Sequence, residues 1–209
     1  MFLAAVAGEI SRTPVGPYQS GSYRGEGTGT RHLLTHGVQS DYGIVADRSG
    51  LSIVWAQNGV AQFKINTFGD PHAAWGIPRE QEPPEKSNAI LKMVRVMQAI
   101  DSWAEQFERN HVYMSANGPV IPKVNIGAIH GGAPFRPNYY PGVCSVYVDV
   151  RTPPELRPIQ VQRELKQALS KTGIEYELEM YASLMGYEAK GIEPVVNTLD
   201  RTYQTLFGE

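Results

Sequence analysis

The sequence predicts an α/β chain that carries an inserted α+β sandwich of the ferredoxin-like type. Four stretches alternate polar and apolar residues with the period of a β-strand, and two others repeat apolar residues every three or four positions, as an α-helix does. Their order along the chain is strand, helix, strand, strand, helix, strand. This β-α-β-β-α-β order is typical of an antiparallel sheet that has both helices on one face.

The first strand of this unit spans residues 60–68 and ends at a sharp break. One face holds Ala61, Phe63, Ile65 and Thr67, and the other holds Gln62, Lys64 and Asn66. Gly69 and Pro71 then stop the strand, because glycine turns at little steric cost and proline has no N–H for a ladder. His72 follows on the loop. It could bond only its own backbone, or it could reach a partner surface, and the sequence leaves both roles open.

A long helix is predicted over residues 90–107, with Ser87 or Asn88 placed to cap its first turn. The predicted buried stripe consists of Ile90, Met93, Val94, Met97, Ile100, Ala104 and Phe107. A second helix begins at Pro158 and ends before Gly173. Its buried face consists of Val161, Leu165, Ala168 and Leu169.

The second and third strands are predicted over residues 123–130 and 143–151, and a fourth follows over 174–181. In the second, Val124, Ile126 and Ala128 share one side, and Asn125 lies on the other. In the third, Cys144, Val146, Val148 and Val150 face inward, while Ser145, Tyr147, Asp149 and Arg151 face outward. Cys144, the only cysteine, is therefore predicted to be a small buried apolar residue.

The segments outside the sandwich differ in character. Residues 1–7 and 42–46 are predicted to be buried strands, and the second of these presents Asp47 at its end, although residues 47–50 also read as an ordinary turn. Residues 10–30 are rich in glycine, serine and proline and predict a loop without a phosphate-binding motif. Short helices are predicted over 31–37 and 194–207.

Composition excludes several classes of function. The 209 residues are 42% hydrophobic and carry a formal charge of −2, which leaves no basic field to hold nucleic acid. No apolar run is long enough to span a membrane. A single cysteine rules out an intrachain disulfide and fits a reducing compartment, so we expect a cytoplasmic protein.

Several motifs, in order along nearly the whole chain, resemble the middle of an M20-family metallopeptidase, the group of acetylornithine deacetylase, succinyl-diaminopimelate desuccinylase, aminoacylase and carboxypeptidase G. The motifs are Glu9, Gly27-Thr28-Gly29-Thr30, Gly37, Asp41, Asp47-Arg48-Ser49-Gly50-Leu51, Asn58-Gly59-Val60, Gly69-Asp70-Pro71-His72, Ser87-Asn88-Ala89-Ile90, residues 124–132, Asn138-Tyr139-Tyr140-Pro141 and Asp149-Val150-Arg151.

The resemblance implies a hydrolase of amide or peptide bonds with two Zn²⁺ ions, or another divalent metal, in each active site. It acts on small acylated amino acids or peptides and forms a homodimer through its lid domain. Glu9 matches the general base and Asp47 a zinc ligand. His72 matches a lid histidine that serves the partner subunit's site, and Asn125 and Arg151 match substrate-facing positions. The implied domains are residues 1–57, a partial catalytic α/β domain, 58–182, the lid, and 183–209, a return segment.

The chain also departs from the family pattern. Ile10 follows Glu9 where the family has a second glutamate, which is a metal ligand, and no His-x-Asp motif precedes Glu9. Two functions therefore stay open. The chain is part of a zinc-dependent deacylase or exopeptidase that is inactive by itself, or it is a non-catalytic dimerisation or ligand-binding module.

Overall fold

A computed structural model describes residues 2–8, 27–47, 49–116 and 118–208 of the chain. The chain divides into two compact units, one of Val54–Ala189 and one made of the segments on either side of it. Each unit is described by itself below.

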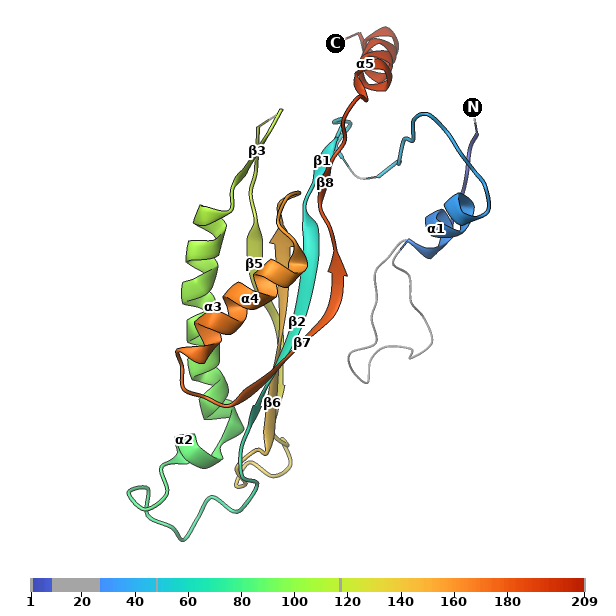
Figure 1. Cartoon of the computed structure of the whole chain (residues 1–209). Helices are drawn as coiled ribbons and strands as arrows, with labels where there is room; N and C mark the ends of the chain where they lie inside the picture. The colour runs from blue at the N-terminus through green and yellow to red at the C-terminus, as the bar shows by residue number, and fades with distance from the viewer. Residues whose placement is uncertain (1, 9–26, 48, 117, 209) are drawn as a thin grey trace. The chain divides into compact units, whose positions relative to one another are not determined.

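The larger unit is built on a four-stranded antiparallel sheet (Figure 1). Its strands are β2 (Gly59–Phe68), β5 (Lys123–Gly131), β6 (Val143–Thr152) and β7 (Tyr176–Leu184), in the spatial order β5-β6-β2-β7. The central strand β2 pairs along nearly its full length with β6 on one side and β7 on the other. The predicted chain order of these strands and the predicted antiparallel sheet are confirmed.

Two helices, α3 (Ala89–Asn110) and α4 (Pro158–Ser170), cover one face of this sheet. The core between the layers includes Phe63 and Ile65 of β2 and Val161, Leu165 and Leu169 of α4, all fully buried. Cys144 is also fully buried, as predicted, and this burial raises the pKa of its thiol. The opposite face of the sheet has no helix over it in the described part of the domain.

The buried stripe of α3 lies on a different flank from the predicted one. The helix buries Ala89, Met93, Val96, Ile100, Trp103 and Phe107, at alternating spacings of four and three. Met93, Ile100 and Phe107 were predicted correctly, but Ile90 and Val94 are 36% and 46% exposed. The prediction was wrong there because α3 has two adjacent apolar flanks, and periodicity cannot say which of them meets the sheet. Asn88 caps the helix, accepting hydrogen bonds from the N–H groups of Ile90 and Leu91.

Strand β5 changes register part-way along its length. Ile126 lies opposite Val148, but the next paired residue is Ala128, opposite Tyr147, so Gly127 is the extra residue of a bulge. The bulge reverses the alternation, and Ala128 is exposed rather than on the core side. Ile129, opposite the buried Val146, takes its place and is 52% exposed at this edge of the sheet.

Short elements complete the unit. The helix α2 (Pro84–Ser87) precedes α3, and β3 (Tyr113–Ser115) and β4 (Gly118–Val120) form a hairpin. At the boundary of the unit, β1 (Ala56–Gln57) pairs antiparallel with β8 (Tyr187–Glu188). The Glu188 carboxylate accepts hydrogen bonds from the Tyr113 hydroxyl at 2.6 Å and the Ala116 N–H at 3.1 Å. The first of these bonds is the main reason why the pKa of Tyr113 is raised to about 12.

The second unit contains the helices α1 (Thr28–Thr35) and α5 (Glu193–Phe207). The helix α5 matches the prediction, and α1 begins three residues before the predicted start. Its N-terminus is held by the Gly27 and Gly29 N–H groups, which donate to the carbonyl oxygens of Gly8 and Ala7.

The two buried strands predicted in this unit are wrong for the described residues. Residues 2–7 and 42–46 form no ladder, and Leu3 and Val45 are 90% and 85% exposed. An apolar run becomes a buried strand only beside a paired neighbour, and no such neighbour occurs among residues 2–8 and 27–47. In the described segments, none of the helices combines the length and the hydropathy that a membrane crossing requires.

We expect the assignment of the core to show in unfolding experiments. Ile100→Ala empties a fully buried position and should lower the free energy of unfolding by about 2–5 kcal/mol. Ile159→Ala, at a position 44% exposed in the first turn of α4, serves as the matched control and should change it by less than about 1 kcal/mol. Urea titration of both variants checks this, and equal losses would contradict the assigned core.

Candidate functional site

The loop that carries His72 is fixed where β2 ends. The Gly69 N–H donates to the Gly142 carbonyl and the Asp70 N–H to the Ser87 carbonyl, both at 2.8 Å. A Cβ on Gly69 would collide with the carbonyl oxygens of Ser87 and Pro141. Glycine is therefore required here because two other segments close on the backbone, and this holds the start of the His72 loop against α2.

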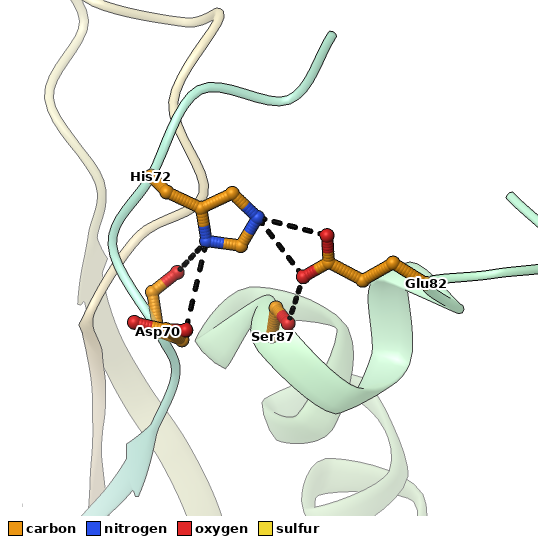
Figure 2. A network of polar contacts seen from close by, with 4 residues as sticks. All are labelled: Asp70, His72, Glu82 and Ser87. Carbon is orange, nitrogen blue, oxygen red and sulfur yellow. Dashed lines mark hydrogen bonds and ion pairs between the residues drawn. The ribbon is translucent and has the colours of Figure 1, made fainter. Parts of the chain in front are cut away.

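Three side chains, those of Asp70, Glu82 and Ser87, lie around His72 (Figure 2). Its Nδ1 lies 2.9 Å from the carbonyl oxygen of Asp70 and 3.8 Å from the Asp70 carboxylate. Its Nε2 lies 2.9 and 3.0 Å from the two carboxylate oxygens of Glu82. The Ser87 hydroxyl donates to Glu82 Oε1 at 2.5 Å. Both ring nitrogens of His72 are thus engaged within its own segment of the chain.

These contacts shift the titration of both partners. The hydrogen bond to Glu82 is the main cause that raises the pKa of His72, against a smaller opposing effect of desolvation. The hydrogen bond from Ser87 is the main cause that lowers the pKa of Glu82. The histidine therefore holds its proton, and the glutamate its negative charge, over a wider pH range than either group would alone.

A surface hollow of about 520 Å³ lies beside this network. Pro71, Tyr140 and Pro141 contribute to its wall, and the Tyr140 ring meets the His72 ring edge-on at a centroid distance of 5.0 Å. The guanidinium of Arg136, also in the wall, lies 5.2 Å from the centre of the Tyr139 ring. The hollow therefore offers aromatic surface and the Arg136 guanidinium.

A second polar cluster lies on the open face of the sheet. The Asp149 carboxylate accepts hydrogen bonds from Gln62 Nε2 at 2.9 Å and from Arg151 Nε at 2.7 Å. Asn125 lies opposite Asp149 in the neighbouring strand. The Arg151 side chain is 52% exposed, and its ion pair uses only Nε. Among the described residues its terminal N–H groups have no hydrogen-bond partner, so they are available to bind a carboxylate.

The sequence profile of the peptidase dimerisation domain of the M20 family matches residues 80–177, most of the sandwich. The chain contains an M20 peptidase dimerisation domain. The matched residues include Glu82, Ser87, Asn125 and Arg151, whereas His72 lies just before them.

Solved structures share the fold of this dimerisation domain. An amidase of the hydantoinase/carbamoylase family from Burkholderia vietnamiensis has a TM-score of 0.52 and 18% identity, over 70% of this chain and 33% of that chain. A hydantoinase/carbamoylase family amidase from Burkholderia ambifaria gives 0.52 and 11%, over 72% and 34%. The protein AtUAH in complex with glyoxylate gives 0.54 and 15%, over 72% and 33%. The match thus spans about a third of the length of each of these proteins.

The residues singled out in the sequence fall in separate places. Asn125 and Arg151 lie together in the dimerisation domain, and His72 lies beyond the far end of β2. Asp47 is exposed and does not end a strand, contrary to the prediction. Glu9 lies outside the described residues. Of the two roles left open for His72, the contacts match the local one, because its side chain is only 30% exposed and both ring nitrogens are bonded within residues 70–82.

Sequence reasoning missed the groups that surround the two predicted positions. Glu82 lies ten residues beyond His72, in a proline-rich segment without periodicity, so nothing in the sequence pairs them. The sequence identifies Ser87 only as a candidate helix cap. Asp149 and Gln62 were placed on the polar faces of their strands, but their contact depends on the register of β2 against β6. The pairing of polar faces across neighbouring strands could have suggested this contact.

The described residues do not fit the two-metal site that the family resemblance implies. Nowhere in residues 2–8, 27–47, 49–116 and 118–208 do three or more histidine, cysteine, aspartate or glutamate side chains group as metal ligands do. A zinc site needs about four ligands in close array, usually with imidazole or thiolate among them.

We expect the isolated chain to bind Zn²⁺ only weakly. The gain should fall well short of the roughly 10–16 kcal/mol of structural zinc sites, because the described residues offer no preformed ligand group. Calorimetric titration with zinc chloride measures this directly. A tight site of defined stoichiometry would contradict the expectation and would direct attention to ligands outside the described residues.

Proposed function

We propose that this chain supplies the dimerisation domain of an M20-type hydrolase that cleaves amide or peptide bonds in N-acyl amino acids or small peptides. In this function His72 serves the active site of the partner subunit, and Asn125 and Arg151 contact the substrate. The family match and the amidases that share the fold support the proposal. The observation that supports the shared site most directly is that His72 and Arg151 of one chain lie near opposite ends of strand β2.

That separation follows from the register of β2. Val60 lies opposite Arg151 near one end of the strand, and Phe68 is its last residue, shortly before His72. Eight positions at about 3.3 Å each place the two ends about 26 Å apart. A single acyl amino acid cannot touch both groups at that distance. Two copies side by side can offer the histidine of one and the arginine of the other to one substrate.

The edge of the sheet at β5 is the surface we assign to the dimer contact. The apolar flank of α3 that the core does not use contains Ile90 and Val94, and Ile90 approaches Gly132, just beyond the end of β5. Glu108, further along the same flank, binds the Val124 N–H of β5 at 2.9 Å. Ile129 adds exposed apolar surface on the strand itself. An apolar edge strand beside an apolar helix flank is suited to pairing with its own copy.

The chemistry follows from what the side chains can donate. A protonated His72 donates a hydrogen bond to the oxygen of the scissile carbonyl and stabilises the negative charge that develops there. The Arg151 guanidinium binds the carboxylate of the amino-acid part of the substrate, and the Asn125 amide helps to orient the substrate. Asp149 holds Arg151 through Nε, which leaves the two terminal nitrogens for a bidentate contact.

A non-catalytic dimerisation or ligand-binding module is the second candidate. The lack of a metal-ligand group in the described residues favours it, since the family chemistry needs such a group. The hydrolase and a dimerisation module both require the dimer, but only the hydrolase requires His72 for turnover.

The dimer contact can be tested with a matched pair of isoleucines. We expect the wild-type chain to sediment as a dimer at micromolar concentration and Ile129→Lys to sediment as a monomer, because a lysine on an edge strand opposes pairing. Ile159→Lys introduces the same charge at a position of similar exposure on α4, away from β5, and should remain dimeric. A wild-type chain found only as monomer would refute the assigned contact.

The role of His72 can be tested in a preparation of the protein that hydrolyses an N-acyl amino acid or a small peptide. His72→Ala should lower kcat by about 10²–10³-fold and leave the dimer intact, as expected for loss of one donor to the oxyanion. His111→Ala is the control, since His111 also bonds a glutamate, Glu164, but lies at the C-terminal end of α3. Normal turnover of the His72 variant would exclude the role.

Mixing two inactive variants tests whether the site is shared. If His72 and Arg151 act from different copies, a mixed dimer of His72→Ala and Arg151→Ala has one intact site. Random exchange between the two then restores about a quarter of the wild-type activity, since half of the dimers are mixed and half of their sites are intact. No recovery after exchange would place both residues in one subunit.

A further inference from the structure

The hydrogen bonds around His72 define its protonation state. Nδ1 faces the carbonyl oxygen of Asp70, which can only accept a hydrogen bond, so Nδ1 carries a proton. Nε2 faces the Glu82 carboxylate, which also only accepts when it is ionised. The Ser87 hydroxyl donates to the same carboxylate and keeps it ionised. This geometry therefore favours the doubly protonated ring, the imidazolium, over either neutral tautomer of His72.

The groups that hold the ring are anchored to the fold. Glu82 precedes α2, whose last residue is Ser87, and Asn88 then begins α3 as its cap. The Ser87 carbonyl accepts the Asp70 N–H, which joins the beginning of the His72 loop to the end of α2. The other side of the ring meets the edge of Tyr140, whose N–H donates to the His72 carbonyl at 2.9 Å. Figure 2 shows the contacts of the ring with Asp70 and Glu82, and Tyr140 adds a third segment that orients it.

We propose that Glu82 is a positioning residue for His72, which fixes the orientation of the ring and keeps both of its nitrogens protonated at neutral pH. An imidazolium can donate a hydrogen bond to an anionic oxygen but cannot accept a proton. His72 is thereby committed to binding negative charge and is withdrawn from general-base chemistry. Its meaning for catalysis rests on the proposed function, but the ion pair itself does not.

Glu82 also sets a condition on any ligand of His72. The carboxylate occupies the position next to Nε2 that an anionic oxygen of a substrate would need. Such an oxygen must displace Glu82 or share the same N–H with it. Among the described residues, the Asp70 carboxylate also lies near the ring, on the Nδ1 side, and it does not compete for Nε2.

The test is ¹⁵N NMR of the histidine rings in the whole chain across a pH titration, which needs no turnover. In the wild type we expect His72 to show both nitrogens protonated at pH 7. Glu82→Gln keeps the shape of the side chain and removes its charge, so the midpoint of the His72 titration should move to lower pH. Glu82→Asp retains the charge and should keep part of the raised midpoint.

A matched control is available elsewhere in the domain. Glu164 lies 3.1 Å from Nε2 of His111, so Glu164→Gln makes the same chemical change at another glutamate–histidine pair. It should leave the His72 titration unchanged. Ser87→Ala removes the hydroxyl that orders Glu82 and should lower the His72 midpoint by less than Glu82→Gln does. Backbone amide shifts of β2 report whether each variant stays folded.

An unchanged His72 midpoint in Glu82→Gln, or an equal change in Glu164→Gln, would overturn the proposal. If Glu82→Gln does not fold, the Ser87→Ala variant provides the test, and an unchanged midpoint of the His72 titration in that variant would overturn the proposal. In an active preparation, loss of the Glu82 charge should shift the alkaline limb of the kcat profile to lower pH, whereas His72→Ala lowers kcat at every pH. An unshifted profile together with an inactive His72→Ala would refute the positioning role and leave the proposed function standing.

Discussion

The strict alternation of residues along β2 is the constraint on which the rest of the domain depends. Every second residue from Gly59 to Thr67 is buried against the helices, so a slip of one position would bring Gln62, Lys64 and Asn66 into the core. Because β2 is central, its register also fixes β6 and β7. The same alternation places Gln62 beside Asp149 and thereby holds Arg151. The alternation along β2 thus determines both the buried core and the arrangement of polar side chains on the open face of the sheet.

Much of the sandwich could be predicted from the sequence, because strands and helices with strong periodicity carry their own signal. All four strands, both long helices and the burial of Cys144 agree with the structure. The flank of α3 could not be chosen, since Ile90 and Val94 are as apolar as Val96 and Trp103, and only contact with the sheet separates them. The exposed apolar runs at residues 2–7 and 42–46 show a related limit. Hydrophobicity predicts that a segment needs a partner, but not that one is present.

The candidate site also contains residues that the sequence identified and residues that only the structure shows. The Gly69-Asp70-Pro71 break marked His72 as a loop residue, and the polar face of β6 marked Arg151. The groups that tune these side chains are absent from any local pattern. Glu82 reaches His72 only because α2 folds back on the end of β2, and Gln62 reaches Asp149 only through strand register. Contacts of this kind depend on the path of the backbone through space, which local sequence does not encode.

The pairing of β1 with β8 has a consequence for how such a domain is carried in a longer chain. The chain enters and leaves the sandwich at adjacent positions, with Gln57 opposite Tyr187 and the Ala189 N–H bonded to the Trp55 carbonyl. The two ends of the sandwich are therefore as close together as the two strands of a β-hairpin, although more than 120 residues separate them. Closing such a loop costs little additional entropy, since that cost grows only with the logarithm of length. Termini that lie this close together are the condition under which insertion of a domain into another chain is tolerated.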